Sequence, residues 1–330
     1  MLLIVNIKIE FSASLSKLHP MTRKWRFEKE HGLYHVINRG NYRQSVFGSV
    51  GAARAFETTL WDAVKLHGWR LHAYVLMSNH YHLAVETPVP NLGEGMHWLQ
   101  STFAARFNRF RKEQGHLFQG RYKALAVEND AALARVVDYI HLNPVRAHLV
   151  EPALLDCFRW SSLRSFVRDE RPPGLIGERI MAFWQMPDNK TGWSKYLVRL
   201  KELATDEAEQ KRMGLESLSK GWAIGTDSWR AELAKTFAQR KFLGLARGEA
   251  IQMKEACWQA LLEEHCVRLS KTDKDLSPLK PRQPDEPWRW ELARALRTAG
   301  ASYTWIAVNL RYPSAASLRV RMHRAKSVNN

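Results

Sequence analysis

The sequence predicts an α+β fold with a split βαββαβα sheet in the first half and a mostly helical region in the second. Short apolar runs alternate with segments of helical spacing over the first 150 residues, and strand signals fade beyond about residue 175. A polar, proline-rich stretch then precedes a last compact unit. A hydrophobic share of 45% and an aromatic share of 11% suit a folded protein with real cores.

The first four elements are predicted from apolar spacing and glycine stops. Residues 33–40, LYHVINRG, read as a strand that a glycine turn closes, and residues 48–68 have the helical spacing of an amphipathic helix ending at Gly68. Residues 69–88 form two apolar runs on either side of the polar break MSN. This pattern predicts two strands joined by a short turn.

The next three elements complete the first unit. Residues 91–112 have apolar side chains at spacings of three and four, and residues 115–128 are strand-like. A third helix is expected to begin with Asp130 as its N-cap and to end at Pro144. The resulting order, βαββαβα, suggests a ferredoxin-like split sheet with its helices on one face.

Changes in composition divide the chain into five predicted units. They are an N-terminal extension at 1–20, the α+β domain at 21–170, a helical accessory region at 171–269, a linker at 270–286 and a helix-turn-helix-like unit at 287–330.

Charge and cysteine content restrict the function classes. Fifty Lys and Arg against 33 Asp and Glu give a net charge of +17, which favours a polyanion such as nucleic acid, although a basic surface without a partner is the alternative. The three cysteines form no CxxC pair, which argues against a disulfide framework or a zinc ribbon and suits a cytoplasmic protein. No apolar run is long enough for a membrane span. The sequence contains no GxxxxGK[ST] loop, so no nucleotide cofactor is expected.

Two histidines one residue apart occupy an apolar run, LMSNHYHLAVE. Because side chains alternate along a strand, His80 and His82 share one face and Tyr81 points to the other. Two imidazoles in this arrangement can bind one divalent cation. The alternative is a pair of hydrogen-bonded sheet histidines.

The third helix carries two polar residues at the edge of its apolar stripe. Tyr139 and Asn143 are one turn apart, so a hydroxyl nucleophile and an amide oxygen can meet at one place. Alone, the pair also fits a tyrosine that borders a core and an asparagine that ends a helix.

The segments MSNHYHL, FQGRYKALAVE and DYIHLNPVRAHLV, in this order, resemble the REP-associated tyrosine transposases. These belong to the single-tyrosine HUH (His-hydrophobic-His) class, within the IS200-like transposase superfamily. HVINRGNYRQSVF and FRWSSLRSF also resemble that family, and the similarity covers about residues 21–166.

The resemblance implies a function and a site. It implies an HUH transposase domain that cleaves and rejoins single-stranded DNA near hairpins, with Mg²⁺ or Mn²⁺ as cofactor. It assigns His80, His82 and Asn143 as metal ligands and Tyr139 as the nucleophile that forms a 5′-phosphotyrosine. The middle residue of the triplet, Tyr81, is bulkier and more polar than the aliphatic residue usual in the family.

Basic and aromatic residues near the predicted site are candidates for holding DNA. Arginine and lysine neutralise phosphates, and tyrosine can stack on an unpaired base. The candidates are Arg39, Arg43, Arg106, Arg109, Gln119, Arg121, Tyr122 and Lys123.

The last unit carries a separate signal for nucleic acid. Residues 287–326 contain eight Lys or Arg and one acidic residue, and they read as three helices. This resembles a helix-turn-helix whose last helix reads duplex DNA through Ser317, Arg319 and Arg321, with a helical bundle with a basic face as the alternative.

We therefore expect a nickase and strand transferase that acts on single-stranded DNA and DNA hairpins, in the cytoplasm and associated with the nucleoid. A non-catalytic hairpin-binding regulator with the same fold is the first alternative, and an RNA-binding protein is the second. A monomer is expected, with a dimer as the alternative.

Overall fold

The computed structural model describes residues 28–238, 247–272, 275–280 and 284–327. The predicted N-terminal extension, residues 1–20, lies outside the described residues. Within those ranges, no helix is both long enough and apolar enough to cross a membrane.

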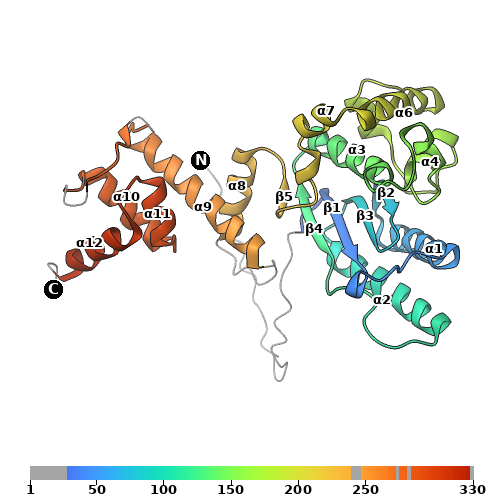
Figure 1. Cartoon of the computed structure of the whole chain (residues 1–330), viewed down its shortest axis with the longest axis horizontal. Coiled ribbons are helices and arrows are strands. Elements are labelled where there is room, and N and C mark those ends of the chain that lie inside the picture. Colours follow the sequence, from blue (N-terminus) through green and yellow to red (C-terminus); the bar gives the residue numbers. More distant parts are fainter. Residues whose placement is uncertain (1–27, 239–246, 273–274, 281–283, 328–330) are drawn as a thin grey trace, which may run out of the picture.

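A mixed five-stranded sheet organises the first half of the chain (Figure 1). Its strands are β1 (Gly32–Arg39), β2 (Arg70–Leu76), β3 (His80–Thr87), β4 (Lys123–Val127) and β5 (Ala223–Ile224), in the spatial order β2-β3-β1-β4-β5. The first four strands are antiparallel neighbours in the ferredoxin-like order, which confirms the predicted α+β class and split sheet. The two-residue β5 was not expected, and it pairs with β4 in parallel.

Helices cover both faces of this sheet, so the expectation of helices on one face was wrong. Helices α1 (Val50–His67) and α2 (Leu92–Arg111) pack on the face that carries Tyr81. The Tyr81 ring lies 4.8 Å from the ring of Phe56 of α1, which in turn lies 5.0 Å from the ring of Phe103 of α2. The opposite face carries the histidine pair and is covered by α3 (Asp130–Arg146), which packs on β2 and β3.

The two ends of α3 differ from the prediction. The N-cap is Asn129, whose side chain accepts a hydrogen bond from the amide of Ala132, so Asp130 is the first helical residue. Pro144 lies inside the last turn rather than beyond the end. A proline there leaves only one carbonyl of the preceding turn without its amide partner, and the helix closes two residues later.

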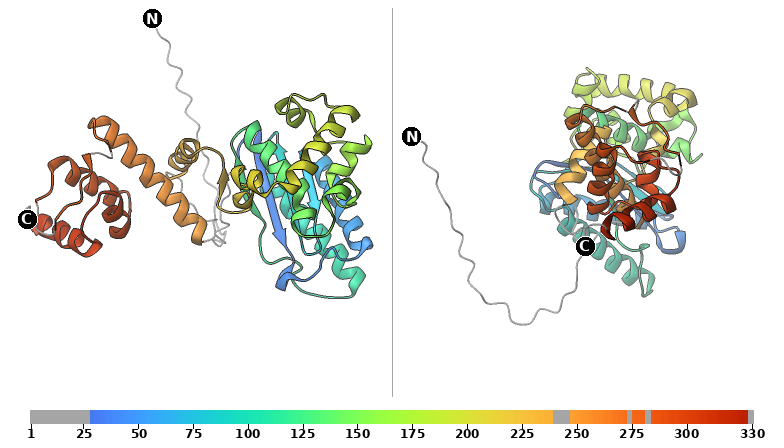
Figure 2. Two further views of the ribbon diagram at one scale, coloured as in Figure 1. Left: turned by 45° about the horizontal axis from the view of Figure 1, so that its top comes forward. Right: turned by 90° about the vertical axis from the view of Figure 1, so that its left-hand side faces the viewer.

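The accessory region builds a helical layer against α3 (Figure 2). Its helices in this layer are α5 (Glu178–Phe183), α6 (Lys190–Thr205), α7 (Glu207–Arg212) and the short η3 (Leu215–Ser217). The short helix η2 (Pro152–Cys157) and α4 (Ser162–Arg168) precede the region, and η1 (Asn41–Arg43) lies in the loop after β1. Helix α6 buries Trp193 and Tyr196 against the main core.

A second core lies in the C-terminal part, away from the sheet (Figures 1 and 2). Helices α8 (Asp227–Ala238) and α9 (Arg247–Arg268) lead to α10 (Pro287–Thr298), α11 (Tyr303–Asn309) and α12 (Ala315–Ser327). Trp258 of α9 joins this core, as do Leu276 and Leu279. Part of the stretch predicted as a linker therefore packs on the last three helices.

Candidate functional site

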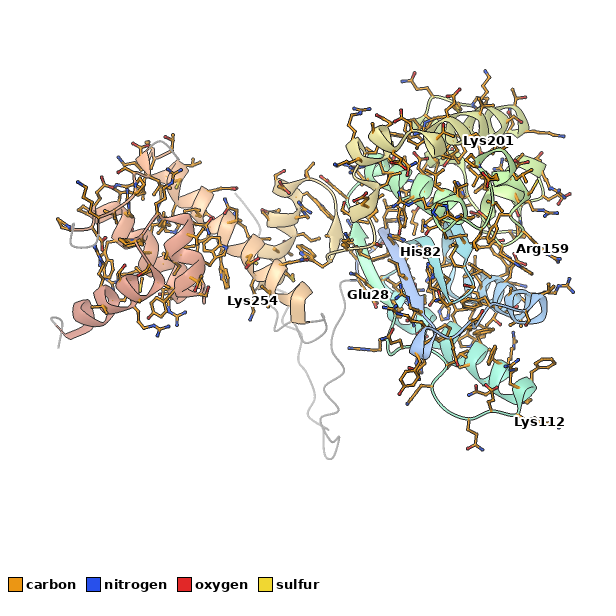
Figure 3. The ribbon with its side chains drawn as sticks, viewed as in Figure 1. Glu28, His82, Lys112, Arg159, Lys201 and Lys254 are labelled. Carbon is orange, nitrogen blue, oxygen red and sulfur yellow. The ribbon has the colours of Figure 1, made fainter. Side chains whose placement is uncertain are left out.

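Three histidines cluster on the face of the sheet beneath α3. His82 is one of them, and Figure 3 shows where it lies in the sheet. His80 and His82 are ring neighbours on β3, with centroids 5.1 Å apart. In the antiparallel register, Arg39 lies opposite His80 and Ile37 lies opposite His82, so these side chains share one face. The third histidine, His35 of β1, lies on the same face, and its ring stacks on that of His82 at 5.1 Å.

Each member of the predicted pair uses its Nδ1 atom within the protein. His80 Nδ1 lies 2.7 Å from the side-chain oxygen of Asn79, and His82 Nδ1 lies 2.9 Å from His35 Nε2. An amide oxygen only accepts, so His80 Nδ1 carries the proton and His80 Nε2 carries a lone pair. This is the tautomer that a metal ligand needs.

Burial keeps these imidazoles neutral. It lowers the pKa of His80 to about 4, and the positive charge of Arg39 adds to this effect. Burial also lowers the pKa of His35 to about 4 and that of His82 well below its ordinary value. All three rings are therefore neutral at pH 7, and a neutral imidazole can bind a cation.

Helix α3 brings Tyr139 over the histidines. Its apolar stripe, with Val136 and Ile140 fully buried, faces the sheet and sets the rotation of the helix. The Tyr139 ring lies 5.4 Å from the ring of His82 and 5.7 Å from that of His35, and its residue is 8% exposed. The tyrosine and the histidine pair, 57 residues apart in the chain, thus belong to one site.

Two polar residues accompany Tyr139 on α3. The Asn143 side-chain nitrogen donates to the carbonyl oxygen of Tyr139 at 2.9 Å, which directs the amide and leaves its oxygen as an acceptor. The Arg146 guanidinium lies 5.5 Å from the Tyr139 ring centroid and is fixed by a 2.9 Å hydrogen bond to Gln210.

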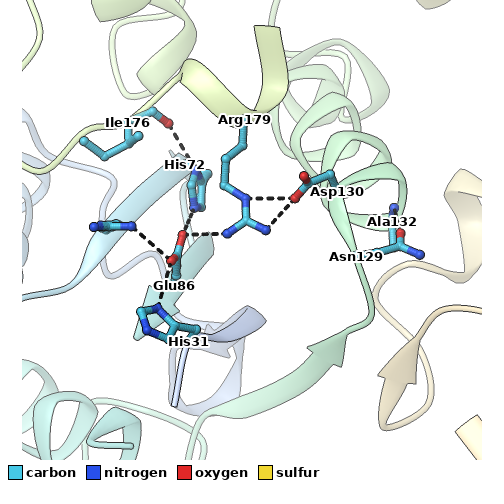
Figure 4. A network of polar contacts seen from close by, with 9 residues as sticks. His31, His72, Glu86, Asn129, Asp130, Ala132, Ile176 and Arg179 are labelled. Carbon is cyan, nitrogen blue, oxygen red and sulfur yellow. Dashed lines mark hydrogen bonds and ion pairs between the residues drawn. The ribbon is translucent and has the colours of Figure 1, made fainter. Parts of the chain in front are cut away.

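Ion pairs fix α3 at two points. At its start, Arg179 of α5 bridges Asp130 and the buried Glu86 of β3, with contacts of 2.6 and 3.2 Å (Figure 4). In its middle, the fully buried Asp138 accepts two hydrogen bonds from Arg199 of α6, at 3.1 and 2.8 Å. The accessory region thus positions the helix that carries Tyr139.

The donor set at this site fits a divalent cation. Among the described residues, no cluster of three His, Cys, Asp or Glu side chains could hold a metal, so a metal here needs a ligand of another kind. The Asn143 oxygen, one helical turn from Tyr139, is the candidate for this ligand. Two neutral imidazoles and one amide oxygen leave coordination positions for water and a phosphate oxygen.

Several of the predicted DNA-binding residues lie around the histidine face. Arg39 and Lys123 are close enough to influence the charge of His80 and His35, respectively. The backbone amide of Gln119 donates to the carbonyl of Arg39 at 2.9 Å, which places the FQGRYK segment at the same end of β1. Arg43, Gln119 and Arg121 are exposed, and Lys123 is half-buried.

Three other candidates lie elsewhere. Arg106 and Arg109 belong to α2, on the face of the sheet opposite the histidines, and Arg106 Nη1 donates to Thr59 of α1 at 2.8 Å. Tyr122 is only 6% exposed and packs in the core, so its ring offers no open surface for a base. The sequence does not show whether the side chain of a given tyrosine or arginine is buried or exposed. Nor does it show on which face of the sheet that side chain lies.

The candidates in the last unit also have different surroundings. Arg319 is exposed, with its guanidinium 5.2 Å from the Tyr303 ring centroid. Arg321 makes a 2.7 Å ion pair with Asp285, so it contributes to the fold of this unit. The Ser317 hydroxyl donates to the carbonyl of Ser314 at the start of α12.

Sequence reasoning missed two residues of the site, His35 and Arg146, and one exposed aromatic residue, Tyr42, in the loop after β1. His35 could not be identified from the sequence because its contact with His82 depends on the register between β1 and β3. The sequence of one strand does not show that register. Arg146 lies in the DYIHLNPVRAHLV segment, where helical spacing of seven from Tyr139 could have marked it. Tyr42 is 93% exposed in the loop after β1, with a left-handed φ of 50°.

Part of the chain is similar to known proteins. Residues 28–143 match the model of the family described as IS200-like transposases. A solved REP-associated tyrosine transposase bound to a REP hairpin is 17% identical, with 48% of this chain and 92% of that chain covered and a TM-score of 0.38. A candidate transposase from Deinococcus radiodurans R1 is 18% identical, with 48% and 98% covered and a TM-score of 0.26.

No curated protein matches the chain. The matched family segment contains both histidines, Tyr139 and Asn143. The resemblance that the motifs predicted is therefore confirmed over residues 28–143, which are similar to the IS200-like transposases.

Proposed function

We propose that this protein is a metal-dependent single-strand DNA endonuclease and strand transferase that cleaves beside palindromic, REP-type hairpins through a 5′-phosphotyrosine. The observation that carries the proposal is the convergence of Tyr139 with the histidine pair, at a ring distance of 5.4 Å from His82. The family match supports the transposase role independently of this geometry.

Tyr139 is the proposed nucleophile. Its hydroxyl oxygen attacks the phosphorus of the scissile phosphodiester, the new bond forms between that oxygen and phosphorus, and the bond to the 3′ oxygen breaks. The departing 3′ oxygen takes up a proton, and the tyrosine hydroxyl loses one. Because the phosphotyrosine is itself a phosphodiester, attack by a 3′ hydroxyl in the reverse direction rejoins strands without a nucleotide cofactor.

His80, His82 and Asn143 are the proposed ligands of Mg²⁺ or Mn²⁺. When bound, the cation would polarise the scissile phosphate and stabilise charge on the leaving oxygen. Imidazole nitrogens suit transition metals better than Mg²⁺, so Mn²⁺ is the better probe for this donor set. The Arg146 guanidinium beside the tyrosine ring adds positive charge where the phosphate would lie.

The exposed basic residues at the end of β1 supply the proposed path for single-stranded DNA. Arg39, Arg43 and Arg121 would neutralise phosphates, and Gln119 and Lys123 lie beside them. Arg319 and Ser317 of the last unit are proposed to hold the duplex stem of the hairpin. We propose that one chain completes the site, since every proposed catalytic group comes from the same molecule.

The test is formation of a covalent protein–DNA adduct. Purified protein is incubated with Mn²⁺ and end-labelled hairpin oligonucleotides that carry single-stranded flanks, and adducts are resolved on denaturing gels. We expect an adduct with wild-type protein and none with Tyr139→Phe, which keeps the ring and loses only the hydroxyl. Adduct formation that survives Tyr139→Phe would overturn the assignment of the nucleophile.

Two further variants make this test specific. Tyr42→Phe removes the hydroxyl of a fully exposed tyrosine near the same end of the sheet, and it should leave the adduct intact. His80→Ala/His82→Ala should abolish cleavage while oligonucleotide binding persists, and unimpaired cleavage by this variant would reject the metal site. A non-catalytic hairpin-binding regulator, the alternative, predicts binding without any adduct in the wild type.

A further inference from the structure

His35 forms a hydrogen-bonded relay that reaches the proposed metal ligand from behind. Its Nδ1 lies 2.8 Å from the backbone carbonyl oxygen of Leu218, and its Nε2 lies 2.9 Å from His82 Nδ1. Both contacts are buried, and His35 is itself fully buried. The relay joins β1, β3 and the accessory region.

Only one arrangement of protons satisfies both contacts of a neutral His35. The carbonyl of Leu218 can only accept, so the proton of His35 lies on Nδ1. His35 Nε2 then carries a lone pair and accepts from His82, which puts the proton of His82 on Nδ1. His82 Nε2 is left as a lone pair, the form that binds a metal.

The alternative arrangement has no support in the surroundings of His35. If His35 carried both protons, it would donate to His82 Nδ1, and His82 Nε2 would hold a proton and could not bind a cation. A buried imidazolium needs a carboxylate or a second oxygen acceptor, and the hydrogen-bond partners of His35 are a carbonyl and an imidazole.

The carbonyl at the end of the relay is held firmly by the core. Leu215 and Leu218 are buried in the main core, and the strand β5 that follows pairs with β4. The Gly214 that begins this segment has a left-handed φ of 68°, a conformation that favours glycine. Segment 214–224 thus offers a fixed acceptor to the site.

We propose that His35 is a positioning residue of the catalytic centre, which, together with the Leu218 carbonyl, fixes the tautomer and orientation of His82. The proposal rests on the proposed function for the identity of the ligand set, but its hydrogen bonds exist without metal. It gives the segment 214–224 a role in the active site, although this segment lies outside the family match.

His72 provides a matched control. It is also a buried histidine of the sheet, and its Nδ1 also faces a backbone carbonyl, that of Ile176, at 3.1 Å. Its Nε2, however, faces Glu86 at 3.1 Å and not a histidine of the site (Figure 4). A change at His72 therefore removes the same kind of buried contact without touching His82.

The experiment combines a spectroscopic and a binding measurement on the full chain. Long-range ¹H–¹⁵N spectra of protein labelled with ¹⁵N-histidine report the tautomer of each ring, and the His82 signals are identified by their loss in His82→Gln. Mn²⁺ binding without DNA is measured by electron paramagnetic resonance. The variants are His35→Met, which has no acceptor of this kind, His35→Gln, whose amide offers one donor and one acceptor, and His72→Gln.

We expect His82 in the wild type to be protonated at Nδ1. His35→Met should redistribute its tautomers and weaken Mn²⁺ binding by about 10–100-fold, the usual effect of losing a partner behind a metal ligand. His35→Gln should recover most of the affinity, and His72→Gln should match the wild type. The remaining histidine signals show whether each variant is folded.

Two results would overturn the proposal: a wild-type His82 protonated at Nε2, or a folded His35→Met variant with wild-type tautomers and Mn²⁺ affinity. Failure of the proposed function looks different. If wild-type protein binds no Mn²⁺, the metal site is rejected, and the tautomer of His82 in wild type and His35→Met still decides whether the relay exists.

Discussion

Replacing Arg199 with methionine should loosen the helix that carries the proposed nucleophile. Asp138, next to Tyr139, is fully buried, and Arg199 gives it two hydrogen bonds at 3.1 and 2.8 Å. Methionine fills a similar volume but leaves the carboxylate with only the hydroxyl of Tyr196, at 2.8 Å. The perturbation therefore leaves a buried charge without its counter-charge.

The expected cost follows from the burial of the two partners. Breaking a buried pair by removing one partner costs about 3–5 kcal/mol. Arg199 is 24% exposed and Tyr196 still donates, so the lower end of that range applies. A loss of about 3 kcal/mol in the local opening free energy of α3 corresponds to amide exchange roughly a hundredfold faster.

Hydrogen–deuterium exchange of peptides from α3, read by mass spectrometry, measures this change directly. Arg199 also lies 3.5 Å from the ring centroid of Trp184, and that contact is lost as well. A double-mutant cycle with Asp138→Asn removes this contribution, because the Trp184 contact is absent from both Arg199 variants. The double variant should lose less stability than the sum of the two single variants.

The pH dependence carries a definite sign. Burial raises the pKa of Asp138 above its ordinary value of 3.8 despite the opposing charge of Arg199, and loss of Arg199 raises it further. When the pKa of a carboxyl is higher in the folded than in the unfolded state, the group stabilises the fold at a pH below its unfolded-state pKa. This stabilisation is lost as the pH rises through its folded-state pKa. The deficit of Arg199→Met should thus be full at pH 7 and shrink toward pH 4. Exchange unaffected by the substitution, or a deficit that grows on acidification, would refute this reasoning.

Three further predictions concern the rest of the molecule. Tyr42→Ala should weaken binding of a fluorescent single-stranded oligonucleotide by about 1–3 kcal/mol through lost base stacking, whereas Phe110→Ala, at an exposed aromatic of α2, should not; equal effects would reject a stacking role. In the last unit, Arg321→Ala should lower the melting temperature because it breaks the ion pair with Asp285. Arg319→Ala should leave the melting temperature unchanged and reduce the affinity for hairpin DNA, which is measured at several salt concentrations. The hydrogen bond from His72 lowers the pKa of Glu86 from 4.5 to about 2. Glu86 therefore stabilises the fold above pH 4.5, and this stabilisation is lost as the pH falls toward 2. Glu86→Gln should make the free energy of unfolding depend less on pH over that interval, and an unchanged pH dependence would contradict this prediction.

Much of the fold could be predicted because its elements have strong local signals. The apolar stripe of α3 and the alternation along β3 predicted which residues face inward, and Tyr81 does pack against α1 as its position requires. Strand β5 could not be predicted because two residues are too few to show the alternation of a strand. The face of the sheet on which α3 packs could not be predicted either. An apolar stripe shows that one side of a helix is buried, but it does not show which face of a sheet covers that side.

The site could be predicted only in part, for a related reason. The spacing of His80, His82, Tyr139 and Asn143 is legible because each pair lies within one element. His35 depends on the register of β1 with β3 and on a carbonyl 183 residues away, which are long-range facts. Arg106 and Tyr122 show the converse: composition marks them as DNA contacts, and packing directs them to α1 and to the core.

The central claim is that Tyr139 forms the covalent link to DNA, and mapping that link tests it most directly. Trypsin should release residues 136–146, a peptide with Tyr139 as its single tyrosine. After reaction with a hairpin substrate and nuclease digestion, this peptide should carry the mass of a residual nucleotide, as shown by tandem mass spectrometry. A nucleotide on any other tyrosine, or no adduct under conditions in which the protein binds the hairpin and Mn²⁺, would contradict it.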